Sequence, residues 1–493
     1  MYKLLTIILL FIFSDSNAAD NRPNVLFIMV DDLNTELGSY GNEIVKSPNI
    51  DKLAKDGIQF NSAYVQYPVC APSRASLLTG LYPEQTGVIG IGSDFRDNIP
   101  KAVTLPQLFK NEGYYSARVG KIFHYNVPSQ IGTNGQDDSE SWDKVINPIG
   151  IDKEVEKKVD TIRPNFTGDI GGTLTWLNLE SSDKQHTDEK VTSEAINILR
   201  QKNPEKTGKP LFLAVGYFRP HVPLIAPSKY FDLYPLDSIN PPFVPANDRE
   251  DIPEAALADR PMQANMTLKQ KKEVIQAYYA SISFIDHQVG LLLDELESLN
   301  LKRNTIVVFL SDHGFHLGDH GLWQKGDLFE NSVRSPLILS LPNQKVRGTK
   351  TDSLVEFVDI YPTIAEIADI NTPPYLSGKS LIPIIDNPNA VIRTSAFSMA
   401  MSTAWWTRSE LQSLEQMGYS IRTKNYRYTE WSEGHAGIEM YHHETDPNEH
   451  NNLNNNRELA TSKLRLKRLL EKRKLSAKKR ITTIEGNAEA QGL

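Results

Sequence analysis

The chain has 493 residues, of which 40% are hydrophobic and 23% charged, and its formal net charge is −8. This composition is typical of a globular protein, and the acidic balance argues against nucleic-acid binding. Positive charge is concentrated in residues 463–480, which hold ten lysines and arginines and one glutamate. We expect a terminal helix with a solvated basic face there; the alternative is docking to an anionic polymer.

The first 18 residues, MYKLLTIILLFIFSDSNA, have the layout of a secretory signal peptide. Lys3 gives a positive start, residues 4–13 an apolar core, and Ala18 ends a small-residue cleavage site. The apolar core is shorter than the roughly 20 residues that span a bilayer, which disfavours the alternative of a membrane anchor. We therefore predict an exported chain that begins at Ala19, is periplasmic or secreted, and has no membrane span.

Three continuous apolar runs each end in polar residues. They occupy residues 24–32, 211–221 and 304–314. Such runs are typical of strands buried on both faces of a parallel sheet. Helical patterns lie between them at residues 47–57, 105–114 and 268–300, the last as one long helix or two. Alternating strands and helices predict an α/β fold with a large, mostly parallel central sheet flanked by helices.

The pattern changes after about residue 385. Residues 418–431 alternate as paired edge strands do, and residues 439–453 read as a strand followed by an Asp-Pro turn. We predict a main domain over residues 19–385 and a smaller C-terminal α+β subdomain over residues 386–482. That subdomain would hold a small antiparallel sheet and a helix. Residues 483–493 are predicted to form a disordered tail.

Two acidic pairs follow the first and third apolar runs, namely Asp31 with Asp32 and Asp312 with His313. The pairs meet only if their strands are neighbours. Several carboxylates at one point repel each other unless a cation lies among them, and oxygen ligands suit Ca²⁺ or Mg²⁺, although an imidazole leaves room for other metals. The alternative is that the acids cap the helices that follow. Two pairs at strand ends favour a metal.

Positively charged or titratable groups are spread along the chain in five places. Each alone is compatible with a surface charge or a structural histidine, but together they form a plausible cationic clamp for a tetrahedral oxyanion. They are Arg74, Lys121, His124, His221 and Lys325.

Cys70 is the single cysteine of the chain, so it makes no internal disulfide. A lone cysteine in an exported chain indicates a reactive thiol or intermolecular pairing, and the alternative is a buried apolar residue. Residues 69–80 read VCAPSRASLLTG, and this segment resembles the signature of the type I sulfatases. The acidic pairs, Gly-Lys, the histidines and Lys325 occur in that family's order. Residues 120–124, 311–321 and 418–431 most resemble the iduronate-2-sulfatase-like branch.

The resemblance implies an alkaline-phosphatase-like fold, a sulfuric ester hydrolase activity and two cofactors. In this family a maturation system oxidises the signature cysteine to formylglycine, so Cys70 would be a modified residue. One Ca²⁺ would be held by Asp31, Asp32, Asp312, His313 and the residue derived from Cys70. Arg74 would stabilise the formylglycine, His124 would orient or deprotonate it, Lys121 and Lys325 would bind sulfate, and His221 would protonate the leaving alcohol.

The sequence says less about the substrate than about the reaction. Aromatic faces stack on sugar rings, so we predict that a sugar pocket includes Arg96, Trp323, Trp405, Trp406 and Trp431, with packing as the alternative. His316 and His320 follow the second acidic pair and are expected near the pocket. The expected substrate is a sulfated polysaccharide or its oligosaccharides. The alternatives are a phosphomonoester or phosphonate monoester hydrolase, and an inactive glycan-binding homologue.

Overall fold

The computed structural model describes residues 22–162, 170–260, 262–342, 344, 347–402 and 417–485. The predicted signal peptide, with Ala19, lies outside these ranges, and so do Trp405 and Trp406. Within the described part of the chain, no helix combines the length and the apolar character that crossing a membrane requires.

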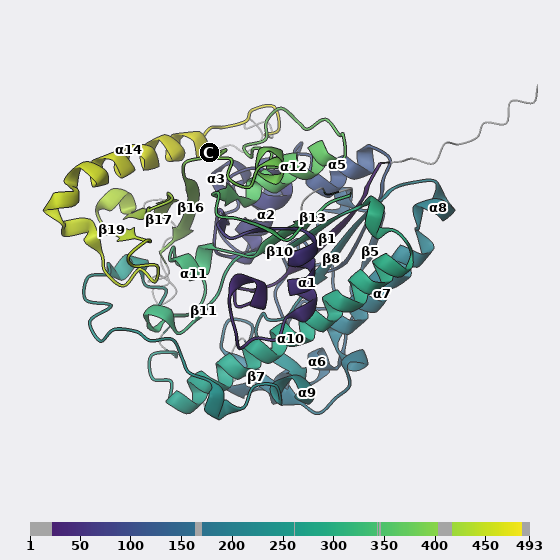
Figure 1. Ribbon diagram of the computed structural model, residues 1–493, viewed down its shortest axis with the longest axis horizontal. Coiled ribbons are helices and arrows are strands. Elements are labelled where there is room, and N and C mark those ends of the chain that lie inside the picture. Colours follow the sequence, from purple (N-terminus) through teal and green to yellow (C-terminus); the bar gives the residue numbers. More distant parts are fainter. Residues whose placement is uncertain are drawn as a thin grey trace, which may run out of the picture.

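An eight-stranded sheet forms the centre of the molecule (Figure 1). Five strands, β10, β1, β8, β4 and β5, run parallel in that order, whereas β13 is antiparallel to both β10 and β2. The prediction of a large, mostly parallel sheet is therefore confirmed. From one edge to the other the strands are β14 (Thr349–Thr351), β2 (Ile58–Phe60), β13 (Leu337–Ser340), β10 (Thr305–Ser311), β1 (Asn24–Val30), β8 (Leu211–Tyr217), β4 (Tyr115–Gly120) and β5 (Lys144–Ile146).

Strand β1 shows why the apolar runs are continuous. Every residue of this strand is buried, and successive side chains point to opposite faces of the sheet. Its odd-numbered residues from Val25 to Met29 belong to one hydrophobic core, and the even-numbered residues from Leu26 to Val30 belong to the other. A strand that is covered on both sides needs apolar residues at every position.

Helices cover both faces of the sheet. The core that contains Leu26 is closed by α1 (Pro48–Asp56), α7 (Thr187–Gln201) and α10 (Leu268–Ser298), and Figure 1 shows α10 running along this side. The core that contains Val25 is closed by α2 (Cys70–Thr79), α5 (Leu105–Asn111) and α12 (Ile360–Ile367). Of the two possibilities for residues 268–300, the single long helix is correct.

Shorter elements complete the main body. A three-stranded sheet has the order β6 (Asp160–Thr161), β7 (Thr175–Leu179) and β9 (Leu224–Pro227). Two-stranded sheets pair β11 (His316–Leu317) with β12 (Trp323–Gln324), and β15 (Val355–Glu356) with β3 (Ala63–Tyr64). The short helices are α3 (Pro83–Thr86), α4 (Phe95–Asn98), α6 (Ile151–Glu154), α8 (Pro204–Thr207), α9 (Ser228–Phe231), α11 (Glu330–Val333) and α13 (Ile382–Asp386).

A smaller antiparallel sheet and a helix form the C-terminal part, as predicted. The sheet has the order β16 (Ala396–Met401), β17 (Met417–Arg422), β18 (Tyr426–Trp431) and β19 (Gly437–His442), and α14 (Ala460–Ala477) packs on it. Figure 1 shows this helix, in yellow, at the margin of the molecule. The sheet shares its core with the side of the main sheet that contains Val25. The domain boundaries at residues 385 and 482 stay predictions.

The first residues of the predicted disordered tail are ordered, which corrects the prediction for residues 483–485. Ile484 is 3% exposed and belongs to the shared core. Its carbonyl accepts a hydrogen bond from the backbone N–H of Lys101 at 3.2 Å. Burying the apolar side chain of Ile484 in this core stabilises the ordered conformation of these residues. The composition of the tail alone did not indicate this burial. Residues 486–493 lie outside the described ranges.

Candidate active site

The two acidic pairs lie at the carboxyl ends of neighbouring strands in the middle of the central sheet. Strands β1 and β10 are parallel neighbours, and Val30 is in register with Ser311, so Asp31 and Asp312 follow directly at the carboxyl ends. The backbone N–H of Asp32 donates to Oδ1 of Asp312 at 3.1 Å. The carboxylates of Asp31, Asp32 and Asp312 are fully buried. In open α/β sheets, ligands bind at these strand ends.

The turn after β1 is held in an unusual conformation by its neighbours. Asp32 has a φ of +63°, in the left-handed region that few residues other than glycine adopt. The hydroxyl of Tyr278, from α10, donates to the carbonyl of Asp32 at 2.7 Å. The N–H of Leu33 donates to Oγ of Ser311 at 2.8 Å. These contacts fix the direction in which the Asp32 carboxylate points.

Arg74, on α2, ties the two acidic pairs together. Its Nε donates to Oδ2 of Asp312 at 2.8 Å, and its Nη2 donates to Oδ1 of Asp31 at 3.0 Å. Its Nη1 donates to the carbonyls of Lys121 and Ile122 at 2.8 and 2.9 Å. The guanidinium is fully buried. A planar, always charged fork suits such a set of acceptors, so Arg74 positions the acids and the loop after β4.

Cys70 is the first residue of α2, and its thiol is enclosed by the acidic pairs and by Lys325. Its Sγ lies 3.2 Å from Nζ of Lys325 and 3.3 Å from Nε2 of His313. It also lies 3.6 Å from Oδ1 of Asp31 and 3.9 Å from Oδ1 of Asp32. The residue is only 3% exposed. The structure therefore brings the signature cysteine and the acidic residues into one site.

Two lysines reach the same carboxylates from different segments. Nζ of Lys121, which follows β4, lies 2.7 Å from Oδ2 of Asp31, and Lys325, which follows β12, forms an ion pair with Asp32. Burial alone would raise the pKa of Asp31, but Lys121, His221 and Arg74 together lower it well below its usual range. Burial raises the pKa of Asp32, against the opposing effect of Lys325.

The donor set fits a hard divalent cation. Asp31, Asp32 and Asp312 supply carboxylate oxygens, and Oδ2 of Asp32 has no hydrogen-bond partner among the described residues. The Nδ1–H of His313 donates to the carbonyl of Gly314 at 2.9 Å, so its Nε2 carries the lone pair. That Nε2 lies 3.4 Å from Oδ1 of Asp32 and 3.6 Å from Oδ1 of Asp312. An oxygen-rich set with one imidazole is compatible with Ca²⁺.

His221 lies in the loop after β8 and faces the site with one nitrogen. Its Nδ1–H donates to the carbonyl of Val222 at 2.6 Å. Its Nε2 lies 3.9 Å from Oδ2 of Asp32. Burial lowers the pKa of His221, and Lys325 lowers it further. The fixed ring leaves Nε2 as the atom that can exchange a proton in the site.

His124 is a buried histidine whose ring nitrogens both lack a hydrogen-bond partner among the described residues. Burial lowers its pKa well below the usual value, and Lys121 and Arg74 act in the same direction. It lines a small hollow together with Ala71, Arg74 and Gln136. A neutral imidazole with free nitrogens beside α2 can accept a proton or orient a hydroxyl.

The residues predicted for a sugar pocket have other contacts in the structure. Trp323 and Trp431 are each 1% exposed and belong to the hydrophobic cores, and Nε1 of Trp431 donates to Glu439 at 2.7 Å. The guanidinium of Arg96 pairs with Asp138 at 2.9 Å and also donates to Gln107. These contacts give the three side chains packing and ion-pair roles.

Asp327 and Arg260 lie near the site and were not singled out from the sequence. Nε2 of His316 lies 3.0 Å from Oδ1 of Asp327, two residues after Lys325. Burial would lower the pKa of His316, but Asp327 raises it to about 10. Arg260 is the second. Burial lowers its pKa to about 10, although the negative charges of Asp32 and Asp327 act to raise it. Asp327 could have been found by its closeness to Lys325, whereas Arg260 carries no local signal.

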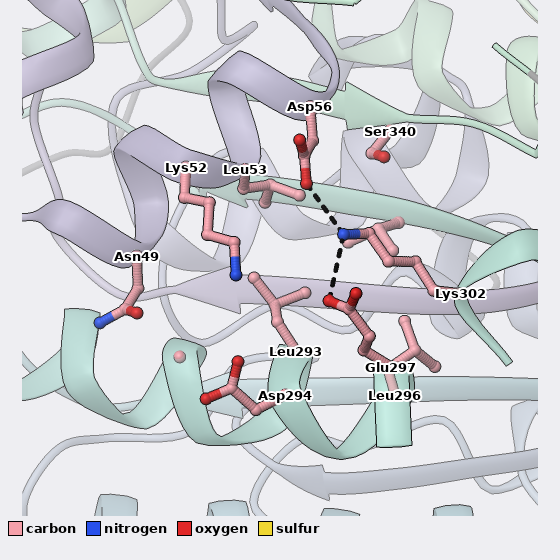
Figure 2. A pocket seen from close by; sticks show the side chains of 12 residues that line it. Asn49, Lys52, Leu53, Asp56, Leu293, Asp294, Leu296, Glu297, Lys302 and Ser340 are labelled. Atoms are coloured by element: carbon pink, nitrogen blue, oxygen red, sulfur yellow. Dashed lines mark hydrogen bonds and ion pairs between the residues drawn. The ribbon is translucent and has the colours of Figure 1, made fainter. Parts of the chain in front are cut away.

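A separate pocket lies between α1 and α10, near the amino end of β10 and opposite to the strand ends that carry the acids (Figure 2). Lys302 bridges Asp56 at 2.8 Å and Glu297 at 3.4 Å across this pocket. Lys302 precedes β10, and Ser340 pairs with the start of that strand. The pocket is therefore remote from the strand ends that carry Cys70 and the acids.

Comparisons with known proteins agree with this geometry. The family described as Sulfatase matches residues 23–370, and the family described as N-sulphoglucosamine sulphohydrolase, C-terminal, matches residues 318–476. A protein named Sulfatase from Formosa agariphila is 34% identical over 92% of this chain and 87% of its own. Iduronate 2-sulfatase from Homo sapiens is 32% identical over 90% of this chain and 93% of its own.

Solved structures show the same fold. A structure determined in complex with its substrate D-glucosamine-2-N,6-O-disulfate has a TM-score of 0.71 at 24% identity, covering 93% of this chain and 98% of its own. The phosphonate monoester hydrolase of Agrobacterium radiobacter has a TM-score of 0.75 at 23% identity, covering 92% and 96%. The fold is alkaline-phosphatase-like, with a smaller C-terminal sheet. The matched family, the two relatives at more than 30% identity and the converged residues lead to one conclusion: this chain belongs to the sulfatase family and is a sulfuric ester hydrolase.

Proposed function

We propose that this enzyme hydrolyses O-sulfate esters of a sulfated polysaccharide or its oligosaccharides through a formylglycine derived from Cys70. The observation that carries the proposal is the meeting of Cys70 with Asp31, Asp32 and Lys325 at the carboxyl edge of the sheet. Relatives named as acting on carbohydrate sulfates, such as iduronate 2-sulfatase and an N-acetylglucosamine-6-O-sulfatase from Bacteroides thetaiotaomicron, support the substrate class.

The cation of the proposed enzyme is Ca²⁺, held by Asp31, Asp32, Asp312, His313 and residue 70. When bound, it would neutralise charge on the sulfate and make a hydroxyl on residue 70 more acidic. The hydrated aldehyde would supply two hydroxyls, one to attack sulfur and one to expel sulfate afterwards. A serine lacks the second hydroxyl and would stop at a stable sulfate ester, which is a chemical reason for an aldehyde at this position.

The remaining roles follow from the positions of the side chains. Lys121 and Lys325 project into the site beside Asp31 and Asp32, so their ammonium groups are placed to bind sulfate oxygens. Nε2 of His221 is placed to give a proton to the departing alcohol, because Nδ1 is fixed on Val222. Proton transfer of this kind typically contributes about 10² to 10⁴ in rate.

His124 and Arg74 complete the proposed machinery. His124 stays neutral because its pKa lies well below the usual value, so it is available to accept a proton from a hydroxyl on residue 70. Arg74 holds Asp31 and Asp312 in place and adds positive charge next to residue 70. A maturation system acting on Cys70 and export directed by residues 1–18, to the periplasm or the medium, belong to the same proposal.

The test compares sulfate and phosphate monoesters of the same sugar, using enzyme co-expressed with a maturation system. Peptide mass spectrometry first establishes the chemical state of residue 70. We expect sulfate release to be the faster reaction and to disappear in Cys70→Ala, with the fold of that variant intact by circular dichroism. A preference for the phosphate ester would favour the phosphohydrolase alternative. Retained activity in Cys70→Ala would contradict the nucleophile.

A further inference from the structure

A second group of metal-binding side chains lies outside the active site. Asp248 precedes α10 by a long loop, His320 lies between β11 and β12, and His450 follows β19. One potential ligand atom from each residue lies within 4.8 Å of the other two. The three loops come from distant parts of the sequence, so the fold and not local spacing brings these atoms together.

The distances within this group resemble those of a metal site. Nδ1 of His320 lies 3.0 Å from Oδ2 and 3.3 Å from Oδ1 of Asp248. Zinc bonds of about 2.0–2.1 Å in a tetrahedron place neighbouring ligands about 3.3 Å apart. Asp248 and His320 are each 2% exposed, whereas His450 is half-buried. Solvent is therefore excluded from Asp248 and His320, and the cluster is accessible to solvent through His450.

Neighbouring contacts fix the ligands. The ring of His320 stacks on Phe329, with 4.2 Å between ring centroids and 26° between planes, and it meets the ring of His450 edge-on at 5.5 Å. The two loops that carry Asp248 and His450 are joined by Asn452, whose backbone N–H donates to Oδ2 of Asp251 at 2.9 Å. Such outer contacts orient metal ligands and reduce the entropy lost on binding.

We propose that Asp248, His320 and His450 bind one Zn²⁺-type divalent cation, with a solvent molecule as the fourth ligand. Two imidazoles and one carboxylate suit zinc and its neighbours in the first transition row, whereas the oxygen-rich set around Cys70 suits Ca²⁺. The cation joins the C-terminal sheet to the loop that leads to Lys325. This inference does not depend on the proposed sulfatase mechanism.

A nearby group of similar composition lacks this capacity. Glu330, His443 and Glu449 also approach one another closely, but both glutamates are paired with Arg427. A cation there would have to displace a buried guanidinium. Among the described residues, His320 is the one titratable side chain that forms an ion pair with Asp248, so the charge of this carboxylate remains available to a metal.

The test is a calorimetric titration of the full-length protein with Zn²⁺ in a large excess of Ca²⁺, the cation proposed for the acidic site. We expect wild type to take up one equivalent that His450→Ala does not, with affinity lowered more than about 100-fold in the variant. Asp248→Asn, which preserves the shape of the side chain, should show the same loss. His435→Ala is the matched control, because His435 is an exposed histidine of the same subdomain outside the cluster.

Thermal unfolding gives a second measurement that needs no activity. In the same excess of Ca²⁺, Zn²⁺ should raise the Tm of wild type and of His435→Ala more than the Tm of His450→Ala. Any zinc that enters the acidic site does so equally in all variants, so the difference of one equivalent isolates this cluster. Equal uptake by wild type and His450→Ala, or no uptake by wild type, would reduce the cluster to a hydrogen-bonded His320–Asp248 pair and overturn the proposal.

Discussion

At the scale of single residues, the candidate active site depends on compensating the charge of three buried carboxylates. Removing a charge from water costs several kcal/mol unless a partner compensates it, and Arg74 compensates two acids at once. The signature motif identified Arg74 and Cys70 from the sequence, and the strand-end pattern identified the acids. Which atoms pair could not be predicted, because Arg74 meets Asp31 and Asp312 only after strands 280 residues apart become neighbours.

Replacing Arg74 should therefore destabilise the whole fold as well as the site. Arg74→Ala leaves Asp31 and Asp312 without their buried partner and should lower the free energy of unfolding by about 3–5 kcal/mol. Arg74→Lys keeps the charge but loses the planar fork, so an intermediate loss is expected. Urea denaturation at neutral pH measures both. An Arg74→Ala protein as stable as wild type would show that Asp31 and Asp312 are protonated or that water solvates their charges in place of Arg74.

Removing the proposed cation should also lower stability, since a cation that binds only the folded chain stabilises it by mass action. At a free concentration 100 times its Kd, the gain is about 2.7 kcal/mol. We expect a chelator to lower the Tm of wild type and added Ca²⁺ to restore it. Asp312→Asn, which removes one charged ligand, should respond much less. A wild-type Tm that changes with neither the chelator nor added Ca²⁺ would argue against the metal site.

At the scale of elements, the sequence predicted the strands that carry the site but not the arrangement of the sheet. The runs at β1, β8 and β10 are recognisable because both faces of each strand are covered. The antiparallel direction of β13 was not predictable, because Leu337–Ser340 is as apolar as any parallel strand and its direction depends on the connection that precedes it. The C-terminal strands were predicted because apolar and polar residues alternate along them, although nearly all of these residues are buried on both faces of the sheet.

A buried network attaches this C-terminal sheet to the main body. Arg427, on β18, pairs with Glu330, on α11, and with Glu449, which follows β19. Nε2 of His443 lies 2.7 Å from Glu449. Burial alone would raise the pKa of Glu449, but Arg427 and His443 lower it to about 2. The folded state therefore favours the ionised carboxylate.

This shift predicts a stability loss in acid. The contribution of Glu449 is complete above its unfolded pKa of about 4.5 and is lost as the pH falls to about 2, where the folded protein also takes up the proton. Urea unfolding of wild type should weaken across this range more steeply than that of Glu449→Gln, which cannot titrate. Parallel pH profiles for the two proteins would show that Glu449 contributes no such linkage.

At the scale of the whole molecule, α14 belongs to the shared core although its sequence reads as a basic surface helix. Leu466 and Leu470 are buried against the C-terminal sheet, and Arg473 donates to the hydroxyl of Tyr82 at 2.7 Å. Lys474 is only 5% exposed. The predicted solvated basic face is therefore interrupted by cations that pair with the protein. The sequence showed the charges, but their partners lie up to 391 residues away.

Two leucines of α14 provide a matched test of this packing. Leu470→Ala removes a fully buried side chain and should lower the free energy of unfolding by about 2–5 kcal/mol. Leu475 is 74% exposed, so Leu475→Ala should change stability by no more than about 0.5 kcal/mol. Chemical denaturation of both variants gives the comparison. Equal effects would mean that α14 does not share the core of the molecule.

The enclosure of Cys70 has a consequence for the order of events during synthesis. The thiol is covered by His313, which leaves the ribosome 243 residues later. At about 5–20 residues per second, this interval lasts about 10–50 s. Once the chain closes, an enzyme that must grip the backbone around residue 70 has no access to it. Under the proposed maturation, oxidation and folding therefore compete, and a chain that folds first stays an inactive thiol for its lifetime. The active fraction of a preparation would then depend on the rate of folding as much as on the amount of the modifying enzyme.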